Sequence, residues 1–207
     1  MTEPLKRLKE RMAQLADLGH ASSLANWDQQ TMMPPRGAES RAESLATLTR
    51  ISHELFTDDE TGRLLDGSAQ HLDGADPDSD DVRLVALVRR QWDKSRRVPA
   101  DLAAEMTRAA SMGQEAWIAA REASDFQAFA PYLERNFELA RRYIDCHAGH
   151  GGWQSPYDVV LDDYEPQMPT ADVARLFGEL KDALVPMITR VAAAGSAGDD
   201  DLIRGPF

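Results

Sequence analysis

Apolar side chains recur at intervals of three and four residues along most of this 207-residue chain. The first example runs from about residue 3 to 25, with Leu5, Leu8, Met12, Leu15, Leu18 and Leu24. Since an α-helix turns once every 3.6 residues, this spacing places an apolar stripe on one helix face. We find no run in which apolar and polar residues strictly alternate, as they do in a half-buried β-strand. The sequence therefore predicts an all-α fold.

Proline, glycine and capping patterns divide the chain into about seven helices. Helices are expected over residues 3–25, 38–56, a short stretch after 57–60, 79–97, 99–122, 131–147 and 170–194. The segment from Trp27 to Gly37 breaks the first helical pattern, and Gly149 to Pro156 reads as a loop. Thr57, Ser124 and Thr170 are the expected capping residues. Within the helices, the spacing predicts that Trp92 and Phe137 are buried.

We expect these helices to form a single region over residues 1–207. Its parts are N-terminal helices at 1–66, an acidic loop at 67–78, a helical body at 79–194 and a tail at 195–207. The tail contains Leu202, Ile203 and Phe207, which suggests that a further element packs on it.

The charge balance disfavours nucleic acid as a partner. The chain has 35 acidic and 23 basic residues, a formal charge of −12, and its densest basic stretch, residues 89–97, is interrupted by Asp93. Such a chain repels a phosphate backbone unless its basic groups gather on one face. No apolar run approaches the roughly 20 residues that a membrane span needs, and the polar first residues do not resemble a secretory signal. With Cys146 as its one cysteine, the expected location is the cytoplasm.

The residues alone predict neither a catalytic group nor a metal site. A metallopeptidase helix needs two histidines one turn apart with a glutamate beside the first. His53 and Glu54 begin this pattern, but Thr57 stands where the second histidine is needed, so His53 is interpreted as a structural residue. His147 and His150 lie three residues apart in a glycine-rich segment that does not hold two ligands rigidly. The carboxylates near Tyr164, which are Asp162, Asp163 and Glu165, are interpreted as solvated rather than as an acid–base pair.

Several short segments, taken in order, resemble one family. They are Trp27–Pro34 with Gly37, Arg41 and Ala42; Arg97–Pro99; Ala116–Trp117 with Ala120–Glu122; Ser124–Phe126 with Phe129 and Pro131–Leu133; and Pro156–Asp158 with Leu161–Asp162 and Tyr164–Pro166. Together these segments resemble the N-terminal part of the carboxypeptidase Taq family of thermostable-type zinc metallocarboxypeptidases. Gln167 departs from the family pattern, which commonly has glycine after Glu-Pro.

The resemblance implies a mostly helical enzyme with a deep cleft that removes C-terminal residues from peptides and often forms homodimers. The family's zinc motif, His-Glu-x-x-His with a downstream glutamate, lies in its later half, so zinc is expected in a full-length enzyme and no cofactor in this chain. The chain would then supply the helical lid and one wall of the cleft, and be inactive alone. The alternative is a non-catalytic helical module that binds a partner or itself.

The segment from Trp27 to Pro34 allows two interpretations. In the first, it is a structural corner in which Trp27 is buried while Asp28 and Thr31 cap backbone groups. In the second, Trp27, Asp28, Gln29 and Thr31 contact a peptide substrate at the rim of the cleft. The corner is the favoured interpretation, and both stay open at the level of sequence.

Overall fold

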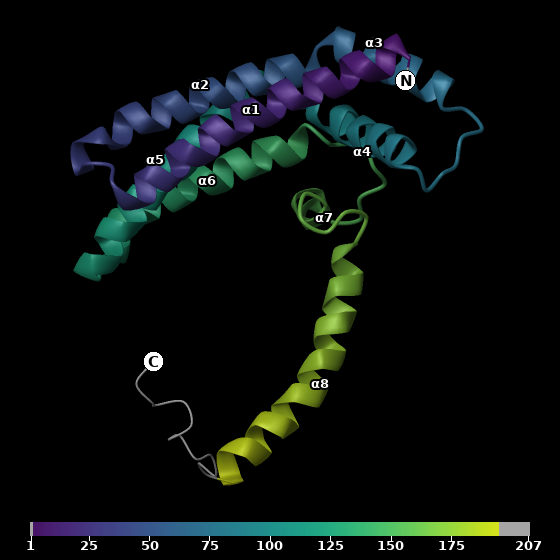
Figure 1. Cartoon of the computed structure of the whole chain (residues 1–207). Coiled ribbons are helices and arrows are strands. Elements are labelled where there is room, and N and C mark those ends of the chain that lie inside the picture. Colours follow the sequence, from purple (N-terminus) through teal and green to yellow (C-terminus); the bar gives the residue numbers. More distant parts are fainter. Residues whose placement is uncertain (1, 195–207) are drawn as a thin grey trace, which may run out of the picture. The chain divides into compact units, whose positions relative to one another are not determined.

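The computed structural model describes residues 2–194, and within this range it contains helices and no strands (Figure 1). The expectation of an all-α fold is therefore confirmed. The helices are α1 (Glu3–Thr31), α2 (Ala38–Thr57), α3 (Asp59–His71), α4 (Asp80–Ser95), α5 (Ala100–Ala123), α6 (Phe126–Asp145), α7 (Pro156–Leu161) and α8 (Thr170–Ala194), and a 3-10 turn, η1 (Pro35–Gly37), joins α1 to α2. The predicted tail, with Leu202, Ile203 and Phe207, lies outside the described residues. Across residues 2–194, every helix is too short or too polar to cross a lipid bilayer.

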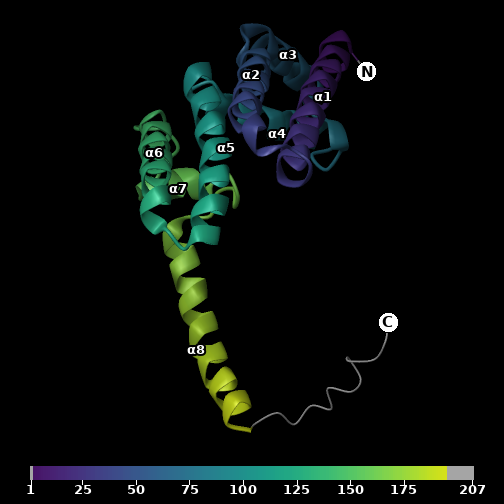
Figure 2. The same cartoon turned by 90° about the vertical axis from the view of Figure 1, so that its left-hand side faces the viewer.

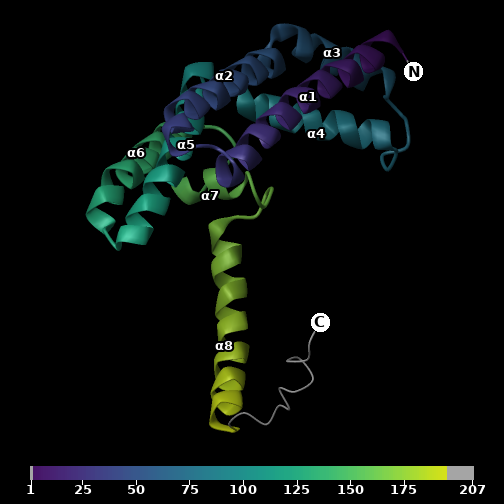
Figure 3. The ribbon, with the colours of Figure 1, turned by 60° about the vertical axis from the view of Figure 1, so that its left-hand side comes forward.

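The chain divides into two compact units, residues 1–149 and 150–207. In the first unit α2 packs along α5, α5 along α6, and α1 against both α2 and α3 (Figure 2). Helix α4 packs on α3, near the N-terminal end of α1 (Figure 3). The second unit contains α7 and α8, which contact each other.

Two apolar clusters hold the first unit together. One joins α1, α3 and α4 through Leu5, Leu8, Leu64, Leu65, Val85, Val88 and Trp92. The other joins the start of α5 to α6 through Val98, Leu102 and Leu139. The buried position of Trp92 confirms its prediction. The prediction for Phe137 is wrong, because its side chain is 57% exposed and Leu139 fills the inward position on α6.

Two expected helix caps are displaced by one residue. Asp58, not Thr57, caps α3 by accepting the Glu60 backbone N–H, and this hydrogen bond is the main reason that the pKa of Asp58 lies below its usual value. Asp125, not Ser124, caps α6 by accepting the backbone N–H of Ala128. Thr57 is the last residue of α2 and Ser124 is the left-handed C-cap of α5, so neither has the extended backbone of an N-cap.

Other helix boundaries also differ from the expectation. Helix α3 continues to His71, so the acidic loop begins later than residue 67. Helix α6 begins at Phe126 rather than Pro131, and the proline lies inside its first turns. Helix α8 begins at Thr170, whose hydroxyl donates to Asp158 instead of capping the helix.

Candidate functional site

The segment from Trp27 to Pro34 completes α1 and turns toward α2. Helix α1 continues to Thr31, so the predicted break at Trp27 is wrong. It ends where Pro34 and Pro35 restrict the backbone before them. Gly37 then allows the close turn, because a Cβ atom at this position would lie 3.0 Å from Cγ of Met33.

Asp28 joins this end of α1 to α2. The guanidinium of Arg41 on α2 donates to the Asp28 carboxylate and to the Ala25 carbonyl oxygen. A cation beside the last turns of a helix also opposes the partial negative charge of the free carbonyl groups there. Asp28 therefore serves an interhelical ion pair rather than a helix cap.

Gln29 joins the same end of α1 to α5. Its side chain is only 7% exposed. The amide nitrogen donates to the backbone carbonyl of Ser111 at 3.3 Å and to Oε1 of Glu115 at 3.0 Å, and the amide oxygen accepts the Ser111 hydroxyl at 3.0 Å. All three contacts cross to one helix, so Gln29 fixes where α1 lies on α5.

Trp27 and Thr31 occupy the outer side of this corner. The indole of Trp27 is 62% exposed, so the expectation that it is buried is wrong. The Thr31 hydroxyl donates to the Trp27 carbonyl oxygen at 2.8 Å within α1. Of the four candidate residues, Asp28 and Gln29 make structural contacts, and Trp27 presents an aromatic surface. The role of these residues at a cleft rim stays a prediction.

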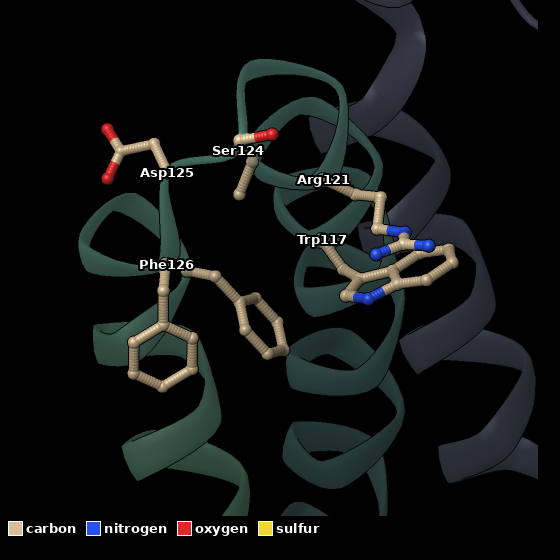
Figure 4. Close-up of a pocket in the computed structure, with 7 residues that line it drawn as sticks. Trp117, Arg121, Ser124, Asp125 and Phe126 are labelled. Carbon is tan, nitrogen blue, oxygen red and sulfur yellow. The ribbon is translucent and has the colours of Figure 1, made fainter.

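A hollow of about 400 Å³ lies at the turn between α5 and α6 (Figure 4). Its walls are formed by Trp117, Ala120, Arg121, Ser124, Asp125, Phe126 and Phe129. Trp117 and Arg121 both come from α5, while the Asp125 carboxylate points away from Arg121 (Figure 4). Because Asp125 caps α6, the hollow offers aromatic surface and a cation rather than catalytic groups.

His53, His147 and Cys146 of the first unit hold structural positions. Nε2 of His53 lies 2.6 Å from the Val98 carbonyl oxygen, so the structural interpretation of His53 agrees with its contacts. His147 is fully buried, with its ring 4.8 Å from that of Tyr143, and Cys146 packs beside the Val98 cluster. Among residues 2–194, no three side chains of histidine, cysteine, aspartate or glutamate are grouped so that they could hold a metal ion. The described residues thus do not fit a catalytic zinc site.

The second unit contains a helix that the sequence analysis missed. Ser155 caps α7 and Pro156 occupies its first turn. The third helical residue, Asp158, accepts the Ser155 backbone N–H at 2.9 Å and so completes a capping box. The spacing of serine, proline and aspartate was a usable signal for this helix.

Asp158 is buried and connects α7 to the start of α8. Oδ2 also accepts the backbone N–H of Gln154 at 3.0 Å, while Oδ1 accepts the backbone N–H of Thr170 at 2.7 Å and the Thr170 hydroxyl. The Thr170 hydroxyl, followed by these backbone donors, lowers the pKa of Asp158 from its ordinary 3.8 to about 2. The carboxylate acts as a structural acceptor, since a general acid or base needs a pKa nearer the working pH.

Among the acidic residues around Tyr164, the expectation of solvated carboxylates is wrong for Asp162. Asp162 is buried and its Oδ1 accepts the Gln167 backbone N–H at 2.9 Å, whereas Asp163 and Glu165 are exposed. Gln167 has a φ of 67°, in the left-handed region that favours glycine. This backbone geometry is one in which glycine would fit without strain.

The described residues define a class of protein: a helical scaffold in which buried polar side chains such as Gln29 and Asp158 join one helix to the next. The sequence pattern of the carboxypeptidase Taq (M32) metallopeptidases matches residues 7–207, and the chain belongs to this family. It is 32% identical to Thermostable carboxypeptidase 1 of Thermus thermophilus and 30% identical to Carboxypeptidase 1 of Bacillus subtilis, each over 98% of this chain. The suspected family is thereby confirmed.

Solved structures support the same assignment. The crystal structure of BsuCP superposes with a TM-score of 0.87 at 29% identity, over 100% of this chain and 40% of the other. The M32 carboxypeptidase of Deinococcus radiodurans R1 gives a TM-score of 0.74 at 31% identity, over 99% of this chain and 40% of the other. This chain spans about 40% of the length of the relatives that it matches.

Proposed function

We propose that this chain is the N-terminal helical portion of a zinc metallocarboxypeptidase that releases C-terminal residues from peptides. The observation that carries the proposal is the family match over residues 7–207 in a chain that covers about 40% of its relatives. The order of the motifs from Trp27 to Pro166 supports the N-terminal assignment. In the whole enzyme, the helices of the first unit would form the lid and one wall of the cleft, and Trp27 would contact peptides at the rim.

Alone, the chain is proposed to be inactive. Zinc hydrolysis needs several protein ligands and a group that takes a proton from the bound water. The sequence contains five histidines, and none of them stands three residues after a His-Glu pair. Zinc and the catalytic base would therefore come from polypeptide other than this chain.

A peptidase assay tests this inactivity. The purified chain is incubated with added zinc and a blocked dipeptide, and release of the C-terminal amino acid is followed with and without EDTA. The expected result is no release above a protein-free control. Turnover that EDTA abolishes would refute the proposed inactivity.

A second candidate function is a non-catalytic module that binds a partner or itself. It is favoured by the exposed apolar side chains of α8, which resemble an interaction surface. An open reading frame that continues beyond Phe207 into His-Glu-x-x-His would exclude this candidate, and a stop codon there would favour it. For both candidates the proposed location is the cytoplasm. Homodimerisation is also proposed, and light scattering tests it.

A further inference from the structure

Helix α8 carries an apolar stripe along its length. Its members are Val173, Leu176, Phe177, Leu180, Leu184, Met187, Ile188 and Val191. Most of these side chains are exposed, from 42% for Leu176 to 67% for Val191, and among the described residues of its own unit the one helix that α8 contacts is the six-residue α7. Apolar surface of this extent that is not covered within its own unit is typical of an interaction site.

The opposite face of α8 carries charged side chains that pair with one another. Arg175 lies 3.0 Å from Glu179 and 3.9 Å from Asp172, so these three charged side chains pair along one side of the helix. The remaining charged residues of α8, which are Lys181, Asp182 and Arg190, also lie outside the apolar stripe. The helix therefore has one face suited to water and one face suited to burial.

The form of the stripe indicates what kind of surface covers it. At 3.6 residues per turn, its members span an arc of about 120°, which exceeds the narrow seam of a two-stranded coiled coil. Leu176 and Ile188 lie on opposite edges of this arc. Pro186 lies inside the helix, where a proline removes one backbone hydrogen bond and bends the axis. A wide stripe on a bent helix fits a broad folded surface better than one straight partner helix.

We propose that the apolar stripe of α8 is the docking surface for the remaining part of the M32 fold. Solved relatives contain this chain's fold in about 40% of their length, so roughly three-fifths of the family's polypeptide is available to cover the stripe. This inference rests on the proposed function, because it assigns the surface through which the helical portion joins the zinc-bearing portion.

Co-production with a relative tests the docking surface. The full chain is expressed together with the part of Bacillus subtilis Carboxypeptidase 1 that the match leaves uncovered, and purified through a tag on the full chain. We expect the two polypeptides to co-purify as a defined complex. Phe177→Glu, which places a charge in the stripe, should weaken binding by roughly tenfold or more. Thr189→Glu adds the same charge on the opposite face and should bind as the wild type does.

Three results would overturn the proposal. The first is failure of the wild-type chain to co-purify with this segment, and the second is equal binding by the two variants. The third is that the chain alone already covers its stripe. This would be shown by a discrete dimer that Phe177→Glu dissociates. It would also be shown by a monomer that binds no more of an apolar dye than the Phe177→Glu variant does. Hydrolysis by the chain alone would refute the proposed inactivity without changing these binding results, so the two failures are distinguishable.

Discussion

At the scale of single residues, the polar side chains that the sequence marks as possible site residues mainly hold helices together. Gln29 is the clearest case, since both ends of its amide are bonded to α5. The Arg41 guanidinium likewise joins α2 to the end of α1 through Asp28 and the Ala25 carbonyl oxygen. Asp28 and Gln29 of the Trp27–Pro34 segment therefore serve contacts between helices, whereas the exposed indole of Trp27 could contact another molecule.

Replacement of Gln29 by leucine should destabilise the first unit. The change keeps the side chain's approximate size but leaves the buried Ser111 hydroxyl without its acceptor, which should lower the free energy of unfolding by about 1–3 kcal/mol. Denaturant unfolding followed by circular dichroism measures this difference. Gln30→Leu is the matched control, because Gln30 is exposed and should change stability by less than about 0.5 kcal/mol. Equal losses in both variants would contradict the role of Gln29.

Asp158 should make the stability of the second unit depend on pH in the acidic range. Its folded-state pKa of about 2 lies below the ordinary 3.8, so its stabilising contribution is complete above pH 3.8 and is lost as the pH falls toward 2. The stability difference between the wild type and Asp158→Asn should thus stay constant above about pH 4 and shrink below it. Denaturant unfolding at a series of pH values measures the difference.

The donor responsible for this shift can be tested separately. Thr170→Val removes the hydroxyl that donates to Asp158, so the carboxyl pKa should rise toward 3.8 in an NMR titration. Thr189→Val is the control, since its hydroxyl donates to the Val185 carbonyl oxygen within α8. An unchanged Asp158 pKa in Thr170→Val would show that the hydroxyl is not the main cause.

At the scale of helices, α3 packs closely against α4 at Gly62. A Cβ atom at Gly62 would lie 2.7 Å from Cζ2 of Trp92, so Gly62→Ala should force α3 and α4 apart and cost about 1–3 kcal/mol in thermal or denaturant unfolding. Gly19→Ala is the control within a helix interior, because nothing lies within 4 Å of its added methyl group. It should stabilise the chain by about 0.5–1 kcal/mol. A loss of stability in Gly19→Ala, or none in Gly62→Ala, would contradict this account of the packing.

The sequence predicts the helices well and their ends less well. Apolar spacing is a property of each whole helix, which is why the all-α fold and the buried Trp92 can be read from it. Caps depend on the backbone of one residue. Thr57 and Ser124 have the right chemistry for a cap, but Thr57 is the last residue of α2 and Ser124 is the left-handed C-cap of α5. The prediction for Phe137 fails because apolar residues lie on more than one side of α6: at 3.6 residues per turn Phe137 and Leu139 are about 200° apart, and Leu139 is the one that is buried.

The candidate site was less predictable, for a different reason. Sequence reasoning selected Trp27, Asp28, Gln29 and Thr31 together, but successive residues of a helix point in different directions. The fold separates them into an exposed indole, an ion pair to α2 and a buried amide on α5. Each residue's role can be assigned only when the helices that pack against α1 are known.

At the scale of the whole molecule, the family match and the absence of a zinc motif lead to one account. The chain matches the M32 pattern over residues 7–207 yet covers about 40% of its relatives, and its sequence has no His-Glu-x-x-His. Our proposal is that it is a scaffold that would complete a metallopeptidase through the stripe of α8, with the metal ligands supplied by other polypeptide.

Zinc content is the most direct measurement of this account. The purified chain is equilibrated with zinc, passed through gel filtration without free metal, and analysed by elemental mass spectrometry. The account predicts far less than one zinc per chain, because no suitable ligand set exists among residues 2–194 and no complete motif exists in the sequence. One tightly held zinc per chain, lost when a histidine of this chain is replaced, would contradict it.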